Sequence, residues 1–139
     1  MILKDKHIFI VEDNTQNRVI FQMALIRHGA NVTFERWGRN VVEVLRRTSK
    51  VDIIILDLML ADHISGFRIF EQIRELPEFA HIPIVAVSAM DAAEAMPIAK
   101  QRGFAGFISK PVDSIVFPQQ IARLIAGEHI WFAGERRIV

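Results

Sequence analysis

The sequence predicts a single α/β domain built around a parallel sheet, and three observations lead to this prediction. The chain has 139 residues, which is the length of one domain. Short apolar runs rich in β-branched residues alternate with stretches that carry apolar residues at helical spacing. The apolar runs are unbroken rather than alternating, as expected for strands buried on both faces of a parallel sheet. Strand followed by helix, five times over, indicates a doubly wound sheet.

Five segments are expected to form the strands. Three are strong apolar runs, at 7–11, 51–56 and 84–87, and two are weaker, at 32–34 and 106–109. For five parallel strands with right-handed crossovers, we expect the flavodoxin-like (βα)5 arrangement with strand order 2-1-3-4-5.

Five further segments are expected to be helical, because each has an apolar stripe and most end at a glycine or proline. Pro97 lies inside the fourth stripe, so we expect that helix to start late or to bend. The stripes and their stops are Val19, Met23 and Ile26 before Gly29; Val41, Val44 and Leu45; Ile69, Ile73 and Leu76 before Pro77; Ala92, Ala95, Met96 and Ala99 before Gly103; and Phe117, Ile121 and Leu124 before Gly127.

The charge balance and the absence of cysteine exclude several classes of function. Lys plus Arg total 17 and Asp plus Glu total 16, so the chain has no overall positive field for nucleic acid or anionic lipid. Without cysteine there are no disulfides, thiolate metal sites or thiol nucleophiles. No apolar run approaches the length of about 18 residues that a membrane helix requires. We therefore expect a cytoplasmic protein with no membrane or direct nucleic-acid partner.

Polar side chains follow the predicted strands at their carboxyl ends. Glu12 and Asp13 follow the first strand, Asp57 the third, Ser88 the fourth and Lys110 the fifth. Ligands of doubly wound sheets bind at this edge, where the strand order reverses. Each residue alone could be an ordinary helix cap, turn residue or surface charge. Their occurrence together at successive strand ends indicates a functional site.

The residue types indicate phosphoryl chemistry with a metal ion. Crowded carboxylates repel one another unless a cation or protons intervene, and an oxygen-only ligand set suits Mg²⁺. A carboxylate can act as nucleophile and form an acyl phosphate, and Asp57 is the candidate because it follows the central strand. Lys110 and Ser88 would supply the cation and the hydroxyl that a phosphoryl dianion needs.

The sequence resembles the receiver domains of two-component response regulators over about residues 5–126. The resemblance implies that Asp57 accepts a phosphoryl group from a histidine kinase or a histidine phosphotransfer protein. It also implies that Mg²⁺ is the cofactor, held by Glu12, Asp13, Asp57 and the backbone carbonyl of Met59. The segments that carry it are specific by their order and spacing: Val11–Asn14, Asp52–Leu60, Val87–Ala89 and Ser109–Pro111.

The resemblance further implies a switch. Lys110 would pair with a phosphoryl oxygen, and Ser88 would move toward the phosphoryl group. Phe107 falls at the aromatic switch position, although a plain core role for it stays open. The fourth helix, fifth strand and fifth helix would then present a changed surface to a partner or to a second copy of the chain.

Three positions depart from the family pattern. Ala61 stands where proline is common, and the stretch 57–66 is one residue longer than usual. Both changes fall in the loop beside Asp57 and would affect partner fit or phosphoryl lifetime. Pro97 interrupts the helix on the signalling side. None of the three removes a chemical group.

The last residues lie outside the expected receiver, which spans 1–127. The tail 128–139 contains Ile130, Trp131 and Phe132, whose exposure to water would be costly. We expect the tail to dock on the last helix or to form an interface with another chain, including a homodimer.

We expect a receiver that is not an enzyme on external substrates. Three other functions stay open. An aspartyl-nucleophile phosphatase would need a second aspartate two residues after Asp57, where Met59 stands. A flavin or nucleotide carrier would need a phosphate-binding loop rich in Gly, Ser or Thr after the first strand, where Glu12 and Asp13 stand. A degenerate receiver that serves as a scaffold would lack Mg²⁺ binding.

Overall fold

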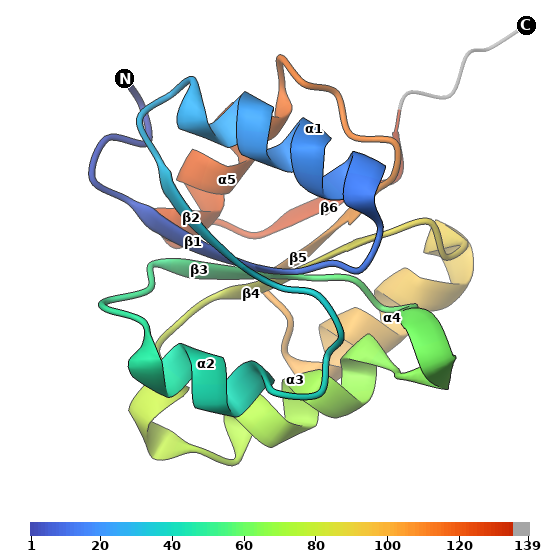
Figure 1. Cartoon of the computed structure of the whole chain (residues 1–139). Helices are drawn as coiled ribbons and strands as arrows, with labels where there is room; N and C mark the ends of the chain where they lie inside the picture. Colours follow the sequence, from blue (N-terminus) through green and yellow to red (C-terminus); the bar gives the residue numbers. More distant parts are fainter. Residues whose placement is uncertain (135–139) are drawn as a thin grey trace, which may run out of the picture.

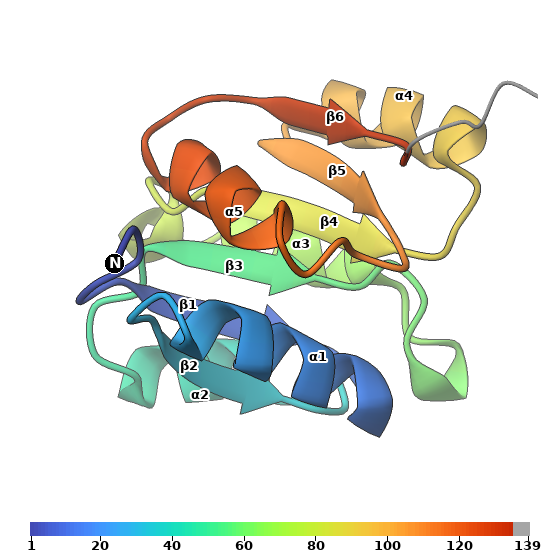
Figure 2. The same ribbon diagram turned by 90° about the horizontal axis from the view of Figure 1, so that it is seen from above.

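The computed structural model describes residues 1–134, which form one parallel sheet with helices on both faces (Figures 1 and 2). The strand order is β2-β1-β3-β4-β5-β6, so the predicted fold class and the order 2-1-3-4-5 are confirmed, with one strand added. The strands are β1 (His7–Val11), β2 (Asn31–Glu35), β3 (Ile53–Leu56), β4 (Ile84–Ser88), β5 (Gly106–Ser109) and β6 (Ile130–Phe132).

The helices divide between the two faces of the sheet (Figure 1). One face carries α1 (Thr15–Ile26) and α5 (Phe117–Ile125), and the other carries α2 (Val41–Arg47), α3 (Gly66–Arg74) and α4 (Ala92–Arg102). Short 3₁₀ helices lie at Ala61–His63 (η1) and Pro77–Phe79 (η2). No helix within residues 1–134 has the length and apolar character needed to cross a bilayer.

Two apolar clusters, one on each face, hold these layers together. Alternate residues of β1 enter them: Phe9 joins the cluster beneath α2, α3 and α4, whereas Ile8 and Ile10 join the cluster beneath α1 and α5. All three side chains are completely buried. The unbroken apolar run of β1 therefore reflects a strand covered on both faces, as predicted.

The first helix is present where the sequence predicted it, but the predicted apolar stripe faces outward. Val19 and Met23 are 48% and 60% exposed, whereas Phe21 and Leu25 are buried. The Phe21 ring packs against Phe117 of α5, with 5.4 Å between the ring centroids. Apolar residues occupy several faces of α1, so periodicity alone did not identify the face that meets the core.

Of the two effects predicted for Pro97, a late start or a bend of the fourth helix, the late start is wrong, because the helix begins at Ala92. Asp91 caps it by accepting a hydrogen bond from the Ala93 amide at 3.3 Å. The helix continues through Pro97 and ends at Gly103, whose φ of +95° suits glycine. The cap and the burial of Ala95 and Ala99 against the sheet outweigh the single backbone bond that Pro97 removes.

The sixth strand was not predicted. It runs parallel to β5, with Ile130 opposite Gly106 and Trp131 opposite Phe107. Ile130 is buried with α5 in the second cluster, and the Lys100 ammonium of α4 lies 5.0 Å from the centre of the Trp131 ring. Strand β5 is therefore an interior strand of the sheet. Of the predicted tail 128–139, residues 135–139 lie outside the described part of the chain.

Candidate functional site

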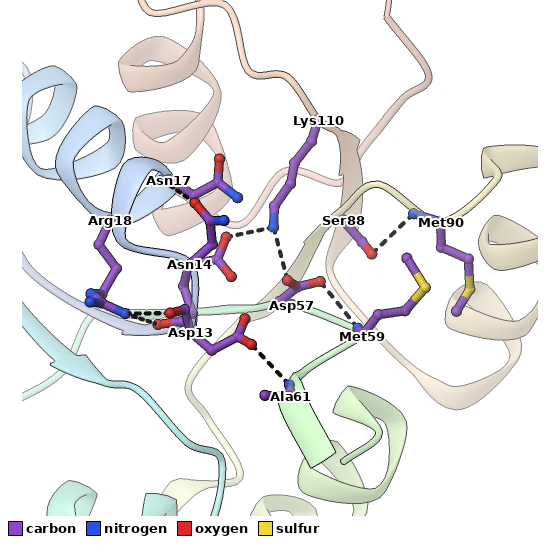
Figure 3. Close-up of polar contacts among 11 residues, drawn as sticks. Asp13, Asn14, Asn17, Arg18, Asp57, Met59, Ala61, Ser88, Met90 and Lys110 are labelled. Carbon is purple, nitrogen blue, oxygen red and sulfur yellow. Dashed lines mark hydrogen bonds and ion pairs between the residues drawn. The ribbon is translucent and has the colours of Figure 1, made fainter. Parts of the chain in front are cut away.

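The residues predicted to form a site are brought together at the carboxyl edge of the sheet (Figure 3). Glu12 and Asp13 follow β1, Asp57 follows β3, Ser88 is the last residue of β4, and Lys110 follows β5. Because β1 and β3 are neighbours and β4 and β5 follow in order, their carboxyl ends meet at one edge. The sheet topology alone therefore gathers side chains that are up to 98 residues apart.

Lys110 links two of the carboxylates. Its ammonium donates to Glu12 Oε1 at 2.5 Å and to Asp57 Oδ2 at 2.8 Å. Both acids are buried, with exposed fractions of 1% and 5%. A buried carboxylate pair is strongly unfavourable without a counter-charge, so the ammonium offsets much of their repulsion.

The ionisation of this group is shifted by burial and by its neighbours. Burial raises the pKa of Glu12 to about 7, since the lowering by the Lys110 hydrogen bond does not compensate and Asp57 raises it further. Burial lowers the pKa of Lys110, but its hydrogen bonds to Asp57 and Glu12 outweigh that effect, and the net pKa is raised. The ammonium is therefore charged at neutral pH, whereas the pKa of the Glu12 carboxyl lies close to neutral pH.

The acidic residues have the composition of a site for a hard divalent cation. Glu12, Asp13 and Asp57 each offer one carboxylate oxygen, and the three oxygens lie within 4.8 Å of one another. Glu12 Oε2 is buried and has no hydrogen-bond partner. A buried oxygen without a donor is costly unless a cation or a proton meets it. Oxygen-only donors with room for waters suit Mg²⁺ better than a soft metal.

Met59, the predicted source of a backbone ligand, lies beside Asp57. Its amide donates to Asp57 Oδ1 at 3.1 Å, and its side chain is partly exposed. The main chain at Met59 is therefore held beside Asp57 through its amide. Both oxygens of Asp57 have protein partners, one from Met59 and one from Lys110.

The two predicted switch residues lie on β4 and β5. Ser88 is fully buried, and its hydroxyl accepts a hydrogen bond from the Met90 amide at 3.2 Å (Figure 3). Phe107 is also fully buried and belongs to the cluster that includes Ala95 and Ala99 of α4. Neither side chain is at the surface, so a change at either one would be transmitted through packing.

Two contacts at the site were not anticipated from the sequence. The side chain of Arg18 in α1 is buried, and its guanidinium donates to the carbonyl oxygens of Glu12 and Asp13 at 3.2 and 2.7 Å. The Ala61 amide donates to Asp13 Oδ2 at 2.9 Å. Arg18 lies in phase with Phe21 and Leu25 on the inner face of α1, and this spacing was a signal that could have identified the first contact. The second depends on loop geometry and has no signal in the sequence pattern.

The chain is similar in sequence to known response regulators. The sequence model of the response regulator receiver domain matches residues 8–122. The two-component response regulator ORR8 of Oryza sativa subsp. indica is 26% identical over 117 residues, which cover 84% of this chain and 96% of that protein. The polar-differentiation response regulator DivK of Brucella anthropi is 30% identical over 107 residues, which cover 77% of this chain and 85% of that protein.

One solved structure that is similar to this chain contains magnesium. The receiver domain of a sensor histidine kinase from Pseudomonas aeruginosa PAO1, solved with a magnesium ion coordinated in its active-site cleft, is similar to this chain. The TM-score is 0.76 at 25% identity, and the match covers 88% of this chain and 98% of that structure.

Proposed function

This chain belongs to the family of response regulator receiver domains in two-component signalling, and from this premise we propose that it is a phosphorylation-controlled switch. Asp57 would accept a phosphoryl group from a phosphohistidine on a histidine kinase or a histidine phosphotransfer protein. The observation that carries the proposal is the Lys110 ammonium between Glu12 and Asp57, at 2.5 and 2.8 Å, beside the third acid Asp13.

The transfer would proceed by in-line displacement at phosphorus. One carboxylate oxygen of Asp57 attacks the phosphorus and forms a P–O bond. The P–N bond to the donor imidazole breaks, and its electron pair stays on the ring nitrogen, which takes a proton from water. The Lys110 ammonium, freed from part of its pairing with Asp57, would then pair with a phosphoryl oxygen.

Mg²⁺ would be held by Glu12, Asp13, Asp57 and the Met59 carbonyl, and when bound it would neutralise charge on the transferred group. The buried Glu12 Oε2 without a partner and the all-oxygen donor set support this assignment. The Ser88 hydroxyl, whose oxygen accepts a hydrogen bond from the Met90 amide, would donate a hydrogen bond to a second phosphoryl oxygen. The protein would act on its own Asp57 rather than on an external substrate.

The test is phosphorylation by a small donor. The protein is incubated with Mg²⁺ and acetyl phosphate, and its intact mass is measured; beryllofluoride binding, followed by NMR, gives an independent signal. We expect one phosphoryl group on the wild type and none on Asp57→Asn, because the amide is a poor nucleophile. Asp52→Asn is the matched control and should be phosphorylated normally, because Asp52 lies at the amino end of β3, away from the site. Equal phosphorylation of Asp57→Asn and wild type would contradict the assignment.

The signal would pass from Ser88 through Phe107 to the surface around α4 and α5. Phe107 supports this route because it is buried among residues of α4 and pairs with Trp131 of β6. The output surface proposed for the family, formed by α4, β5 and α5, differs in this chain because β6 covers the edge of β5. We therefore assign partner or homodimer contacts to α4, β6 and α5.

Two alternatives make different predictions in the same experiments. An aspartyl phosphatase would turn over p-nitrophenyl phosphate, and it would need an acid at position 59, where this chain has methionine. A scaffold that has lost receiver chemistry would bind neither Mg²⁺ nor beryllofluoride. The intact set of Glu12, Asp13, Asp57 and Lys110 favours the switch over both.

A further inference from the structure

A long-range hydrogen bond attaches η1, in the loop between β3 and α3, to Asp13 of the acidic site. The Ala61 amide donates to Asp13 Oδ2 at 2.9 Å, across 48 residues of sequence. Figure 3 shows the Asp13 carboxylate between Ala61 and the Asp57 group. One carboxylate oxygen is therefore taken by the loop, and the other remains for the acidic cluster.

The backbone of this loop needs such an attachment. Asp62 and His63 have φ values of +60° and +57°, a left-handed conformation that is uncommon outside glycine, although Asp and His adopt it more readily than most residues. Two such residues in succession persist only where contacts hold the chain. The Leu60 amide donates to the Ile64 carbonyl at 3.1 Å, and Arg39 pairs with Asp62 at the surface. These contacts close the loop on itself and on the segment before α2, whereas the Ala61 bond connects it to Asp13.

Hydrogen bonds thus hold both the side chain and the main chain of Asp13. The Arg18 guanidinium binds the Asp13 carbonyl at 2.7 Å, and Ala61 binds the carboxylate. A ligand that is hydrogen-bonded through its second oxygen keeps a fixed orientation, and loss of such partners commonly weakens metal binding by tenfold or more. We infer that Ala61 is a positioning residue whose amide holds Asp13 for the cation and ties metal binding to the conformation of the loop.

Proline is the informative substitution at this position. Leu60 has φ −101° and ψ 166°, which is the conformation that a residue before proline prefers. Ala61 is the first residue of η1, where proline is tolerated because its missing amide proton has no helical partner. Ala61→Pro would therefore fit the loop and remove the one proton that reaches Asp13.

This inference rests on the proposed function, and the experiment separates the two. Mg²⁺ binding is measured by calorimetry for wild type, Ala61→Pro and Ala61→Gly at one pH. We expect Ala61→Pro to bind Mg²⁺ about tenfold more weakly, whereas Ala61→Gly, which retains the amide proton, stays within about twofold of wild type. A wild type that binds no Mg²⁺ would overturn the proposed function. A wild type that binds, with Ala61→Pro equal to it, would overturn the role of Ala61 alone.

A metal-free measurement gives a second readout. In EDTA, the Ala61 amide should exchange its proton with solvent about tenfold faster in Asp13→Ala than in wild type, because the acceptor is lost. The Leu60 amide, bonded to Ile64 within the loop, is the internal reference and should change less. Equal exchange of Ala61 in both proteins would show that the bond does not hold the loop, and the inference would fail.

Discussion

Gly106 is the residue that lets β6 join the sheet, and replacing it by alanine is the sharpest test of that strand. A Cβ atom at position 106 would lie 2.3 Å from the Ile130 carbonyl oxygen, more than 1 Å inside the 3.4 Å of ordinary contact. The nearest atoms to that Cβ all belong to Ile130. Gly106→Ala should therefore displace β6 and leave the other strand pairs intact.

The expected loss is modest because β6 is short. Burial of Ile130 and half-burial of Trp131 and Phe132 contribute about 4 kcal/mol, and the strand hydrogen bonds contribute about 2 kcal/mol. Ordering three residues costs about 4 kcal/mol. The difference predicts that Gly106→Ala lowers the free energy of unfolding by about 2 kcal/mol and the melting temperature by roughly 5–10 °C.

The assay combines urea unfolding with tryptophan fluorescence. Trp131 should shift its emission to longer wavelength as β6 leaves the sheet, while Trp37, already 54% exposed, provides a constant background. The control is the same substitution in a chain truncated after Glu128, where the clashing carbonyl is absent. There Gly106→Ala should have almost no effect on stability. The interaction free energy from the double-mutant cycle should therefore be about 2 kcal/mol. An equal loss of stability in both chains would refute the reasoning.

Three further predictions concern the site. Gly66→Ala should lower the free energy of unfolding by about 3 kcal/mol in urea titrations, because its Cβ would lie 2.1 Å from the Asp57 carbonyl oxygen; a stable variant would contradict this. Arg18→Met should lose about 2–4 kcal/mol by the same measurement and weaken Mg²⁺ binding in calorimetry, because the Glu12 and Asp13 carbonyls lose their donor. Without metal, the raised pKa of Glu12, about 7, makes the folded state bind more protons than the unfolded state between pH 4.5 and 7. The stability contributed by Glu12 should therefore fall as pH rises through that range, by at most about 1.4 kcal/mol per pH unit, and Mg²⁺ affinity should rise. The difference between wild type and Glu12→Gln in unfolding experiments isolates the stability effect, and a difference that does not vary with pH would oppose it.

The strands and the edge that holds the site could be predicted because both follow from local pattern plus a topological rule. Unbroken apolar runs such as 53–56 identify strands covered on both faces, and parallel order then places the residues after them at one edge. The positions of Asp57 and Lys110 follow from this rule alone, although they are 53 residues apart. The family resemblance adds the expected roles of these residues, which the experiments above test.

The features that were missed depend on contacts without a periodic signal. β6 contains three residues, too few to show a period, and its pairing depends on the missing side chain of Gly106. The exposed stripe of α1 was misassigned because Phe21 and Val19 are both apolar, and only packing against α5 decides between them. The Ala61 bond to Asp13 depends on the course of a loop, for which composition gives no guide.

The added parallel strand also changes where the chain leaves the domain. Helix α5 runs back toward the amino ends of the strands, so a chain that ended there would exit on the side opposite the acidic residues (Figure 2). β6 crosses the sheet once more in the same direction as β5, and it delivers Phe132 to the carboxyl edge. Any domain, tag or surface tether joined after this strand would start on the same side as Asp57, and would share that rim with an approaching phosphodonor.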